Sequence, residues 1–405
     1  MSEAYPPLIP DDYEPSGLLQ VRIPHRYPGR MTSKIADYVI KNFTKEGDYI
    51  LDPFCGSGSV LMAASVNRRK SVGIDINPLA VAISRSYTKR YHISKLEKYL
   101  TMMMKNLEKV KPSGPRTYEA RLLYWFSPNV LDAIQQIKSL IDEDVPFNYR
   151  IFFLTTLSSI VRSVSRADPK IFPPVYSKYM RKENREATYE DVKLRFREKA
   201  IEAIKAASKG NRTLSPGYNP TVRRGDAFAF LSKNKEKFDS IFTSPPYGFA
   251  QKYTRSTSLE LMTVFGLYGN DLSKIDLKDI GSEITLSRER NYLEDLPRWM
   301  KSRLKGNLES RKIIARYLYK MNTFIEEAYG SLKPSGSLLL FVGENRIGHK
   351  IVPTVRFLLD SAKRAGFELK GIYSDEIRNY SFFTKRNGNS SVIKKEYLLV
   401  LSKSN

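Results

Sequence analysis

Cysteine and histidine are scarce in this sequence, and their scarcity excludes several classes of protein. Among 405 residues there is one cysteine, Cys55, and there are three histidines. A single cysteine cannot form an intramolecular disulfide framework or a cysteine-based zinc cluster. His25, His92 and His349 are far apart in the sequence and show no metal-ligand spacing. We therefore expect no metal site and a reducing, cytoplasmic location.

Long apolar runs are also missing. No run approaches the ~18 residues typical of a transmembrane helix, so we expect no membrane partner. The first residues, Met1 to Pro7, do not resemble a signal peptide. Internal repeats and low-complexity tracts are absent too. Hydrophobic residues make up 41% and aromatic residues 12% of the chain, which is enough for a sizeable core.

Acidic residues are too few to balance the basic ones. The chain has 67 Lys and Arg against 43 Asp and Glu, a formal net charge of +24. Such an excess indicates a polyanionic partner, and nucleic acid is the first candidate. The basic residues are spread along the chain, which favours a broad binding face over a charged tail. The alternative is a generally basic protein without such a partner.

A glycine-containing turn lies between a predicted strand and a predicted helix. The strand is 49–51, the turn is 52–58, and the helix starts near Val60. A second strand, 71–76, carries Asp75 at its end, where a carboxylate can accept both hydroxyls of a ribose. Strand, glycine turn, helix, strand and acid form a βαβ unit that binds a nucleotide cofactor.

The details of this turn favour one cofactor. Gly56 and Gly58 let the backbone approach a ligand where a Cβ would clash. The third glycine of the dinucleotide pattern, near Leu61, is missing. Asp52 would repel a pyrophosphate but suits a cationic ligand with an amino group. The turn therefore favours S-adenosylmethionine over NAD or FAD.

Two further strands end in polar residues. In the first, 222–227, Asp226 is placed either to contact an adenine amine or to cap a helix. The second, 238–242, leads into Thr243-Ser-Pro-Pro-Tyr247. Two prolines stiffen this loop and leave carbonyls as free acceptors. Such a loop can hold the exocyclic amine of a base while Tyr247 stacks on the ring. The Pro-Pro pair in 172–175 lacks both the preceding polar residue and the aromatic directly after it.

Helical patterns dominate the remaining chain, and they predict three regions. Residues 1–91 hold a Pro-rich arm, a helix capped by Thr32 or Ser33, and the cofactor-binding half of a domain. Residues 92–220 are a helical insertion and a possible target-recognition region, because they are too long for a simple crossover. Residues 221–405 are the catalytic half, with a helical, basic segment at about 250–330. Within it we expect helices over 253–267, 288–329 and 352–365. The last two strands, 367–373 and 396–401, could form a β-hairpin, separated by a polar loop at 380–391.

Taken together, these motifs resemble those of class I S-adenosylmethionine-dependent amino-methyltransferases that act on DNA. The resemblance covers five stretches of sequence. They are an N-terminal motif with His25, Pro28 and Gly29, the cofactor loop with Asp52, Pro53, Phe54, Cys55, Gly56 and Gly58, the ribose strand with Asp75, Ile76 and Asn77, the adenine motif with Asp226 and Ala227, and the catalytic loop Ser244, Pro245, Pro246 and Tyr247. The insertion at 92–220 has no matching motif.

The resemblance implies an α/β fold: a Rossmann-like, mostly parallel sheet with a terminal antiparallel hairpin and a helical insertion. It also implies direct methyl transfer from S-adenosylmethionine to an exocyclic amine of a base flipped out of double-stranded DNA, without a metal. Ser at position 244 favours N4 of cytosine, with N6 of adenine as the runner-up. An RNA guanine-N2 methyltransferase and an inactive nucleic-acid-binding relative are further alternatives. A cognate restriction endonuclease is a possible partner, and the oligomeric state stays open.

Overall fold

Seven strands form one sheet at the centre of the computed structural model, which describes residues 5–16, 24–109, 117–169, 171–177, 186–248, 253–284, 290–347, 350–377 and 395–404. The strand order is β3-β2-β1-β4-β5-β9-β8. The strands are β1 (Tyr49–Asp52), β2 (Lys70–Asp75), β3 (Thr221–Arg224), β4 (Phe238–Thr243), β5 (Leu332–Gly343), β8 (Phe367–Glu376) and β9 (Lys395–Lys403). The first five run parallel, and β9 is antiparallel to both β5 and β8. The predicted Rossmann-like sheet with a terminal hairpin is confirmed.

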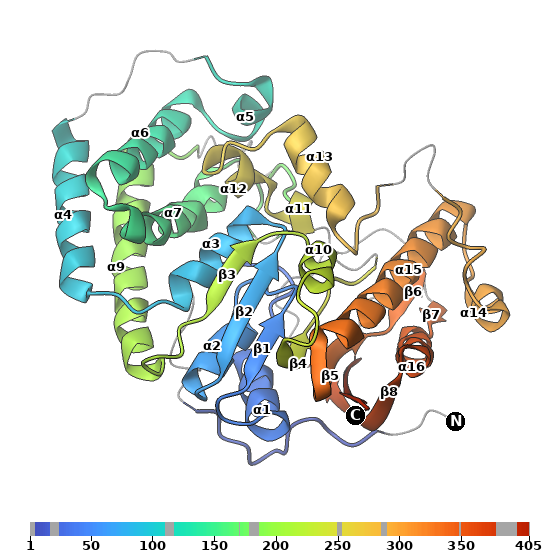
Figure 1. Cartoon of the computed structure of the whole chain (residues 1–405). Coiled ribbons are helices and arrows are strands. Elements are labelled where there is room, and N and C mark those ends of the chain that lie inside the picture. The colour runs from blue at the N-terminus through green and yellow to red at the C-terminus, as the bar shows by residue number, and fades with distance from the viewer. Residues whose placement is uncertain are drawn as a thin grey trace.

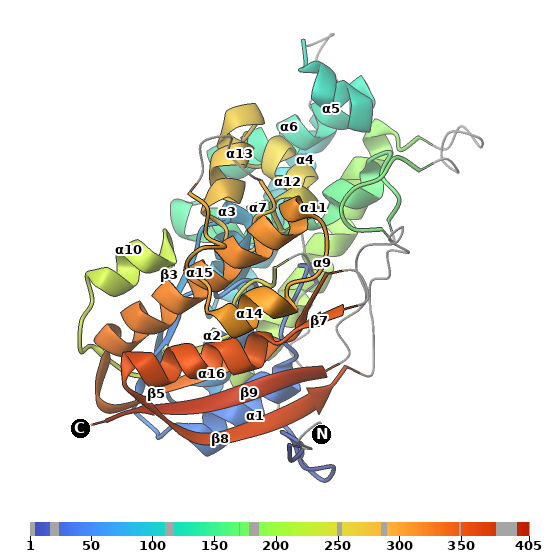
Figure 2. The same ribbon diagram turned by 90° about the vertical axis from the view of Figure 1, so that its right-hand side faces the viewer.

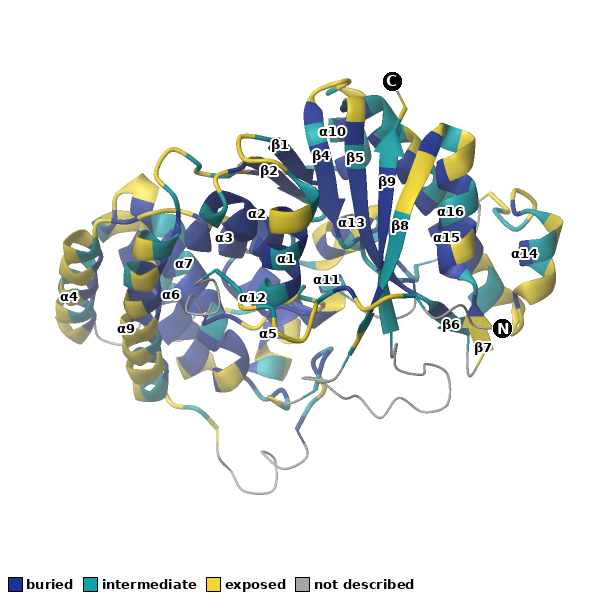
Figure 3. Cartoon of the chain, turned by 90° about the horizontal axis from the view of Figure 1, so that it is seen from below, coloured by how far each residue is buried: buried dark blue, intermediate teal, exposed yellow. Residues whose placement is uncertain are grey.

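The central strands are apolar because helices cover both faces of the sheet. Along β5, Leu339 and Phe341 join one buried cluster, while Leu338 and Leu340 join the other. One face is covered by α1 (Ser33–Phe43), α2 (Ser59–Val66) and α3 (Pro78–Tyr87), and the other by α10 (Ala227–Ser232), α15 (Leu308–Ser331) and α16 (Thr354–Ala365). Figure 3 shows the buried strands between these layers. Thr32 is the N-cap of α1 because its hydroxyl accepts from the Ile35 amide.

A group of helices lies beyond the β3 edge of the sheet (Figure 1). It consists of α4 (Ile93–Lys109), α5 (Ala120–Trp125), α6 (Pro128–Asp144), α7 (Phe147–Val161), the 3-10 turn η2 (Arg162–Val164) and α9 (Tyr189–Thr213). The apolar side chains spaced at helical intervals are buried, apart from the half-buried Tyr99: they are Leu96, Leu100 and Met103 of α4 and Val130, Ile134, Ile137 and Ile141 of α6. These side chains share one hydrophobic cluster with α1, α2 and α3. The insertion therefore packs as a continuation of the core.

Three helix predictions are corrected, two between β4 and β5 and one after β5. The expected helix over 253–267 is two short ones, α11 (Tyr253–Ser256) and α12 (Ser258–Thr263), because Thr257 leaves helical geometry with φ −109° and ψ 11°. The helix α13 (Gly269–Lys278) follows, and α14 (Arg298–Arg303) precedes α15. The expected helix over 288–329 is broken, since Pro297 caps α14 and Gly306 has a φ of +131°. The third, α16, starts at Thr354 because Pro353 precedes it.

The N-terminal arm lies along the outer edge of the sheet. The Leu8 amide donates to the Ser374 carbonyl, and the Ser374 amide donates to the Pro6 carbonyl, both at 2.8 Å. This short parallel pairing covers part of β8, an edge that would otherwise present unpaired backbone groups. Figure 2 shows β8 and β9 beneath α16. The short strands β6 (Asn345–Ile347) and β7 (Lys350–Val352) form a separate antiparallel pair. The predicted loop at 380–391 lies outside the described residues.

Within the described part of the chain, no helix is long and apolar enough to cross a membrane.

Candidate active site

A pocket opens at the carboxyl ends of β1, β2, β3 and β4, where open α/β sheets bind their ligands. Its empty space, including the open mouth, is about 920 Å³, at the upper end of the range for small-molecule sites. Most of the predicted site residues line it: Pro28, Gly29, Asp52, Pro53, Phe54, Cys55, Gly56, Asp75, Ile76, Asn77, Asp226, Ala227, Ser244 and Pro246. Five stretches that are far apart in sequence thus meet at one pocket.

The turn after β1 is shaped by two glycines in the left-handed region. Gly56 has a φ of +48° and Gly58 a φ of +84°. A Cβ on Gly58 would lie 2.5 Å from the Ser84 hydroxyl oxygen, so a side chain does not fit there. Gly58 is the N-cap residue of α2 and does not line the pocket. It fixes the start of the helix, while Gly56 lies at the pocket wall.

Asp75, at the end of β2, holds this turn in place. One carboxyl oxygen accepts from the Gly56 amide at 2.9 Å and the other from the Asn77 amide at 2.8 Å. Burial raises the pKa of Asp75 to about 6, although these hydrogen bonds oppose the shift. The carboxylate is therefore engaged with the backbone while it faces the pocket, and its contact with a ribose stays a prediction.

Asp52 connects the two central strands. Its Oδ1 accepts from the Thr243 hydroxyl at 2.7 Å and from the Phe54 amide at 3.2 Å. Thr243 directly precedes the catalytic loop, so Asp52 links the cofactor turn to that loop. Burial raises the pKa of Asp52 to about 7, which means that placing a cation beside it would favour its ionised form.

Asp226 caps α10, which is one of its two predicted roles. Its Oδ1 accepts from the Phe228 amide at 3.0 Å and the Ala229 amide at 3.2 Å. The residue also lines the pocket. The cap therefore holds Asp226 at the pocket wall, and its contact with an adenine amine stays a prediction.

One wall of the pocket was not predicted from the sequence. Tyr253, Thr254, Lys278, Asp279 and Ile280 come from the segment after the catalytic loop. Arg30 and Met31 from the arm and Phe228 from α10 line it as well. Burial raises the pKa of Asp279 to about 7, and its Oδ1 accepts from the Gly281 amide. No strand precedes Asp279, so no local pattern in the sequence could have indicated it.

His25 does not line the pocket, although the resemblance placed its motif beside the cofactor. The buried ring lies 2.9 Å from the Ser158 hydroxyl through Nε2 and 3.0 Å from the Arg26 carbonyl through Nδ1. Burial lowers the pKa of His25 to about 4. The neutral histidine ties the arm to α7, while Pro28 and Gly29 of the same motif reach the pocket wall.

A second, larger cavity lies beside the first. Its empty space is about 2190 Å³, and Tyr247, Phe341 and Glu396 are part of its lining. Five residues line both cavities: Gly29, Arg30, Met31, Ser244 and Tyr253. Pro245 is buried and lines neither cavity, so its contact with the substrate stays a prediction. The catalytic loop thus lies between the two spaces together with the arm and α11, and Ser244 is the residue of the loop that lines both.

Among the described residues, no group of three or more His, Cys, Asp or Glu side chains is arranged to hold a metal ion.

The sheet order and the pocket at its carboxyl edge define a Rossmann-like methyltransferase. More narrowly, the chain belongs to the DNA methylase family, whose model matches residues 10–86 and 238–405. This family comprises S-adenosylmethionine-dependent amino-methyltransferases, and the predicted class and cofactor are confirmed. The matched ranges include the cofactor turn and the catalytic loop and leave out the whole helical insertion at 92–220.

Two curated relatives are Type II methyltransferases. M.BsoBI of Geobacillus stearothermophilus is 23% identical, over 90% of this chain and 81% of its own. M.MvaI of Kocuria varians is 27% identical over 55% of this chain, and the chain spans about half of its length, 52%. A solved S-adenosylmethionine-dependent methyltransferase from Methanosarcina mazei is 12% identical over 94% of this chain and 99% of that one, with a TM-score of 0.32.

Proposed function

We propose that this chain transfers the methyl group of S-adenosylmethionine to the exocyclic N4 amine of a cytosine flipped out of double-stranded DNA. The observation that supports this most is the position of Ser244, which lines both cavities. In the proposal, the first cavity holds the cofactor and the second holds the base. Ser244 is then the polar residue beside the point where methyl group and amine meet.

The first cavity has the chemistry for this cofactor. Four carboxyl groups line it, from Asp52, Asp75, Asp226 and Asp279, and the cofactor carries positive charge on its sulfonium and amino groups. Asp75 would accept ribose hydroxyls, and Asp226 the adenine amine. When bound, the cofactor supplies an activated methyl group, so the protein has no covalent intermediate to form.

The catalytic loop then positions and polarises the amine. Ser244 Oγ and the Pro245 carbonyl would accept the two amine hydrogens, which draws the nitrogen lone pair out of conjugation with the ring. Tyr247 would stack on the base and stabilise its developing positive charge through the π-face.

The choice of base rests on Ser244. Cytosine-N4 enzymes of this kind mostly carry Ser at this position, whereas adenine-N6 enzymes mostly carry Asp or Asn. The Ser hydroxyl reaches about one bond less far than a carboxylate or amide side chain. The position of the target ring in the pocket should therefore depend on which residue type stands at this position of the loop. N6 of adenine is the second candidate, because the matching family includes both kinds of amine.

Mass spectrometry of nucleosides tests the proposal. The chain is expressed in a host that lacks DNA methylation, and plasmid DNA is digested to nucleosides. We expect N4-methylcytosine, and less of it from cells that express Ser244→Ala at the same level. N6-methyladenine alone would overturn the base assignment and keep the reaction class. Transfer of labelled methyl to tRNA, with none to duplex DNA, would overturn the substrate.

A further inference from the structure

A hydrogen-bonded chain leads from Ser244 through Tyr247 to Glu396. The Tyr247 hydroxyl donates to Glu396 Oε1 at 2.5 Å, a length typical of a hydrogen bond to an ionised carboxylate. Burial and the charge of Glu396 raise the pKa of the Tyr247 phenol well above its usual value, whereas a hydrogen bond with the Ser244 side chain lowers it, as a donor to the phenol oxygen does. The three side chains thus connect the catalytic loop to the first residues of β9.

The sheet holds Glu396 in this position. Within β9 it pairs with Gly343 of β5 on one side and with Asp375 of β8 on the other. Both pairings are antiparallel, and they fix the backbone of Glu396 beneath the catalytic loop. Glu396 and Tyr247 line the second cavity together, next to Ser244. The carboxyl group is therefore built into the wall of the space that we assign to the base.

The proposed reaction releases a proton that needs an acceptor. Nitrogen forms a bond to the methyl carbon while the S–CH₃ bond breaks, and the electron pair of that bond stays on sulfur. The methylated amine is then positively charged and must lose one hydrogen as a proton. The Pro245 carbonyl can accept a hydrogen bond but is too weak a base to keep a proton. Ser244 can take the proton only if it passes its own onward.

We propose that Glu396 is the final acceptor of this proton, which reaches it through Ser244 and Tyr247. The amine proton moves to Ser244 Oγ, the Ser244 proton to Tyr247 Oη, and the Tyr247 proton to Glu396 Oε1. Both hydroxyls are restored, and the carboxylate ends as a neutral acid that later loses its proton to solvent. This inference rests on the proposed function, since it assigns a role at the same site.

The same chain also orients the Ser244 hydroxyl. In this scheme the Ser244 hydrogen points to Tyr247, so the oxygen lone pairs are left for the amine. A hydroxyl that donates into a chain ending at a carboxylate is a better acceptor than an isolated one, because successive hydrogen bonds polarise each other. Glu396 touches no substrate in this scheme and acts through Tyr247 and Ser244.

The surroundings of Glu396 make it a stronger base than an exposed glutamate. Burial raises its pKa, the hydrogen bond from Tyr247 lowers it, and the charge of Asp375 raises it. Lys395 and Glu376, beside it, form an ion pair at 3.9 Å. The other titratable groups around this cavity come from the arm, α1, α11 and the catalytic loop: Tyr5, Asp11, Arg30, Lys34, Tyr247 and Tyr253.

Single-turnover methyl transfer at saturating cofactor, measured from pH 5 to 9, tests the relay. We expect the wild-type rate to rise with pH as Glu396 ionises. Glu396→Gln keeps an acceptor for Tyr247 but cannot take a proton, so the rate should fall roughly 10²-fold and lose this pH dependence. Tyr247→Phe keeps the aromatic ring but removes the hydroxyl that connects Ser244 to Glu396. The rate should therefore fall by a similar factor and lose its pH dependence. The double variant should be no slower than either single variant, because both remove one pathway.

Asp375→Asn is the matched control. It removes a charge beside Glu396 without touching the chain, so the plateau rate should stay unchanged while the rise moves to lower pH. A merely structural role for Glu396 would not produce this shift. Cofactor affinity by calorimetry verifies that each variant is folded.

Two outcomes would overturn the relay: an active wild type whose Glu396→Gln variant keeps the rate and the pH profile, or additive losses in the double variant. A wild type that methylates no DNA overturns the proposed function and the relay with it. Methylation of adenine would leave the relay in place, because the amine loses its proton in the same way.

Discussion

The cofactor pocket and the chain as a whole carry opposite charge. Asp52, Asp75, Asp226 and Asp279 line the pocket, against only Arg30 and Lys278, whereas the chain has a net charge of +24. A uniformly basic protein would repel a cationic cofactor and attract a polyanionic substrate everywhere. This difference in charge indicates that two ligands of opposite charge bind at different places. A cation binds at the carboxyl edge of the sheet, and a polyanion binds on the outer surface.

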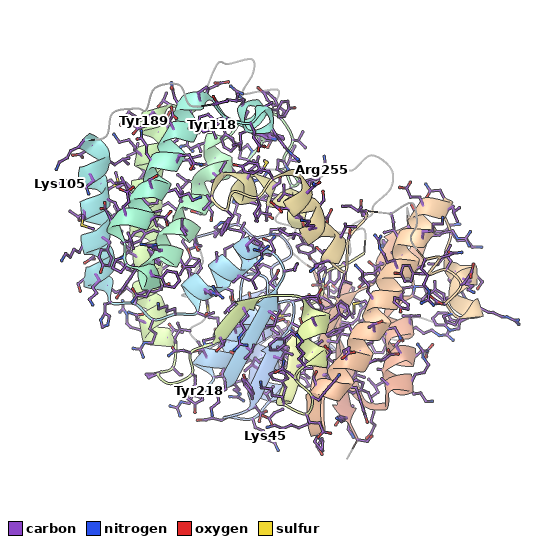
Figure 4. The ribbon with its side chains drawn as sticks, turned by 45° about the horizontal axis from the view of Figure 1, so that its top comes forward. Lys45, Lys105, Tyr118, Tyr189, Tyr218 and Arg255 are labelled. Carbon is purple, nitrogen blue, oxygen red and sulfur yellow. The ribbon has the colours of Figure 1, made fainter. Side chains whose placement is uncertain are left out.

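The basic residues that would meet the polyanion are exposed. Lys105 lies on the outer side of α4, and Arg255 lies on α11, next to the pocket residues Tyr253 and Thr254 (Figure 4). We expect most phosphate contacts from 92–220 and 288–320. Arg255 is a further candidate, because it is exposed close to the site that we assign to the reaction.

Salt concentration should have the largest effect, because it should change DNA affinity strongly and cofactor affinity little. Counterion release makes DNA affinity fall steeply with salt, by roughly 10³–10⁵-fold between 50 and 200 mM if six to ten phosphates are contacted. Cofactor affinity should change little over the same range, because the buried pocket is weakly screened. Binding titrations of both ligands at several salt concentrations check this. A flat plot of DNA affinity against salt would exclude a broad phosphate-binding face.

Tyr247→Ala should weaken base binding and slow methyl transfer without changing cofactor affinity. A stacked base is worth about 1–3 kcal/mol, so both base binding and methyl-transfer rate should fall by up to ~10²-fold. The cofactor pocket does not include Tyr247, so cofactor affinity should stay within about twofold. Single-turnover kinetics and calorimetry on one preparation measure both. Loss of cofactor affinity in a folded variant would contradict the separation of the two cavities.

Asp75→Ala should weaken cofactor binding without changing DNA binding. Removing a charged hydrogen-bond acceptor should weaken cofactor binding by about 1–3 kcal/mol. Because Asp75 also accepts from the Gly56 amide, Asp75→Asn is the matched control, keeping an acceptor for the turn without the charge. Calorimetry should rank wild type tightest, then Asn, then Ala. Unchanged affinity in a folded Asp75→Ala protein would exclude Asp75 from the ribose site.

Acid pH should weaken cofactor binding and stabilise the cofactor-free protein. Burial raises the pKa of Asp75 to about 6 and those of Asp52 and Asp279 to about 7. Between about pH 4 and 7 the folded chain then binds more protons at these groups than the unfolded chain does. Their contribution to stability therefore falls as pH rises through this window.

A cationic ligand reverses that trend, because it favours the ionised carboxylates. The increase in melting temperature caused by the cofactor should therefore grow from pH 5.5 to 8, and less so in Asp279→Asn. Thermal unfolding with and without cofactor measures it. If the increase in melting temperature caused by the cofactor were independent of pH, these carboxyl groups would not contact the cationic part of the cofactor.

Local patterns in the sequence predicted the parts of the fold and pocket that are built locally. The strand, turn and acid around Gly56 and Asp75 are contiguous, so spacing alone places them at one edge of the sheet. Helical patterns likewise predicted that the insertion at 92–220 is helical. Helix ends were less certain, because Thr257 and Gly306 break regular patterns through single residues.

Residues brought in by tertiary packing had no such signal. Asp279 follows a helix and reaches the pocket only because α13 ends there. Glu396 was predicted merely as the start of a strand, and its contact with Tyr247 depends on the pairing of β9 between β5 and β8. His25 belongs to a predicted motif, yet the packing of α7 draws its ring to Ser158.

The measurement that tests the central claim most directly is a pair of values on Ser244→Ala: the single-turnover rate of methyl transfer to DNA and the dissociation constant of the cofactor. Ser244 lines both cavities, and we assign it to the amine. The rate should fall roughly 10–10³-fold, as for the loss of one preorganised hydrogen-bonding group, while cofactor affinity stays within about twofold. A wild-type rate, or a loss confined to cofactor affinity, would show that methyl group and amine do not meet at Ser244.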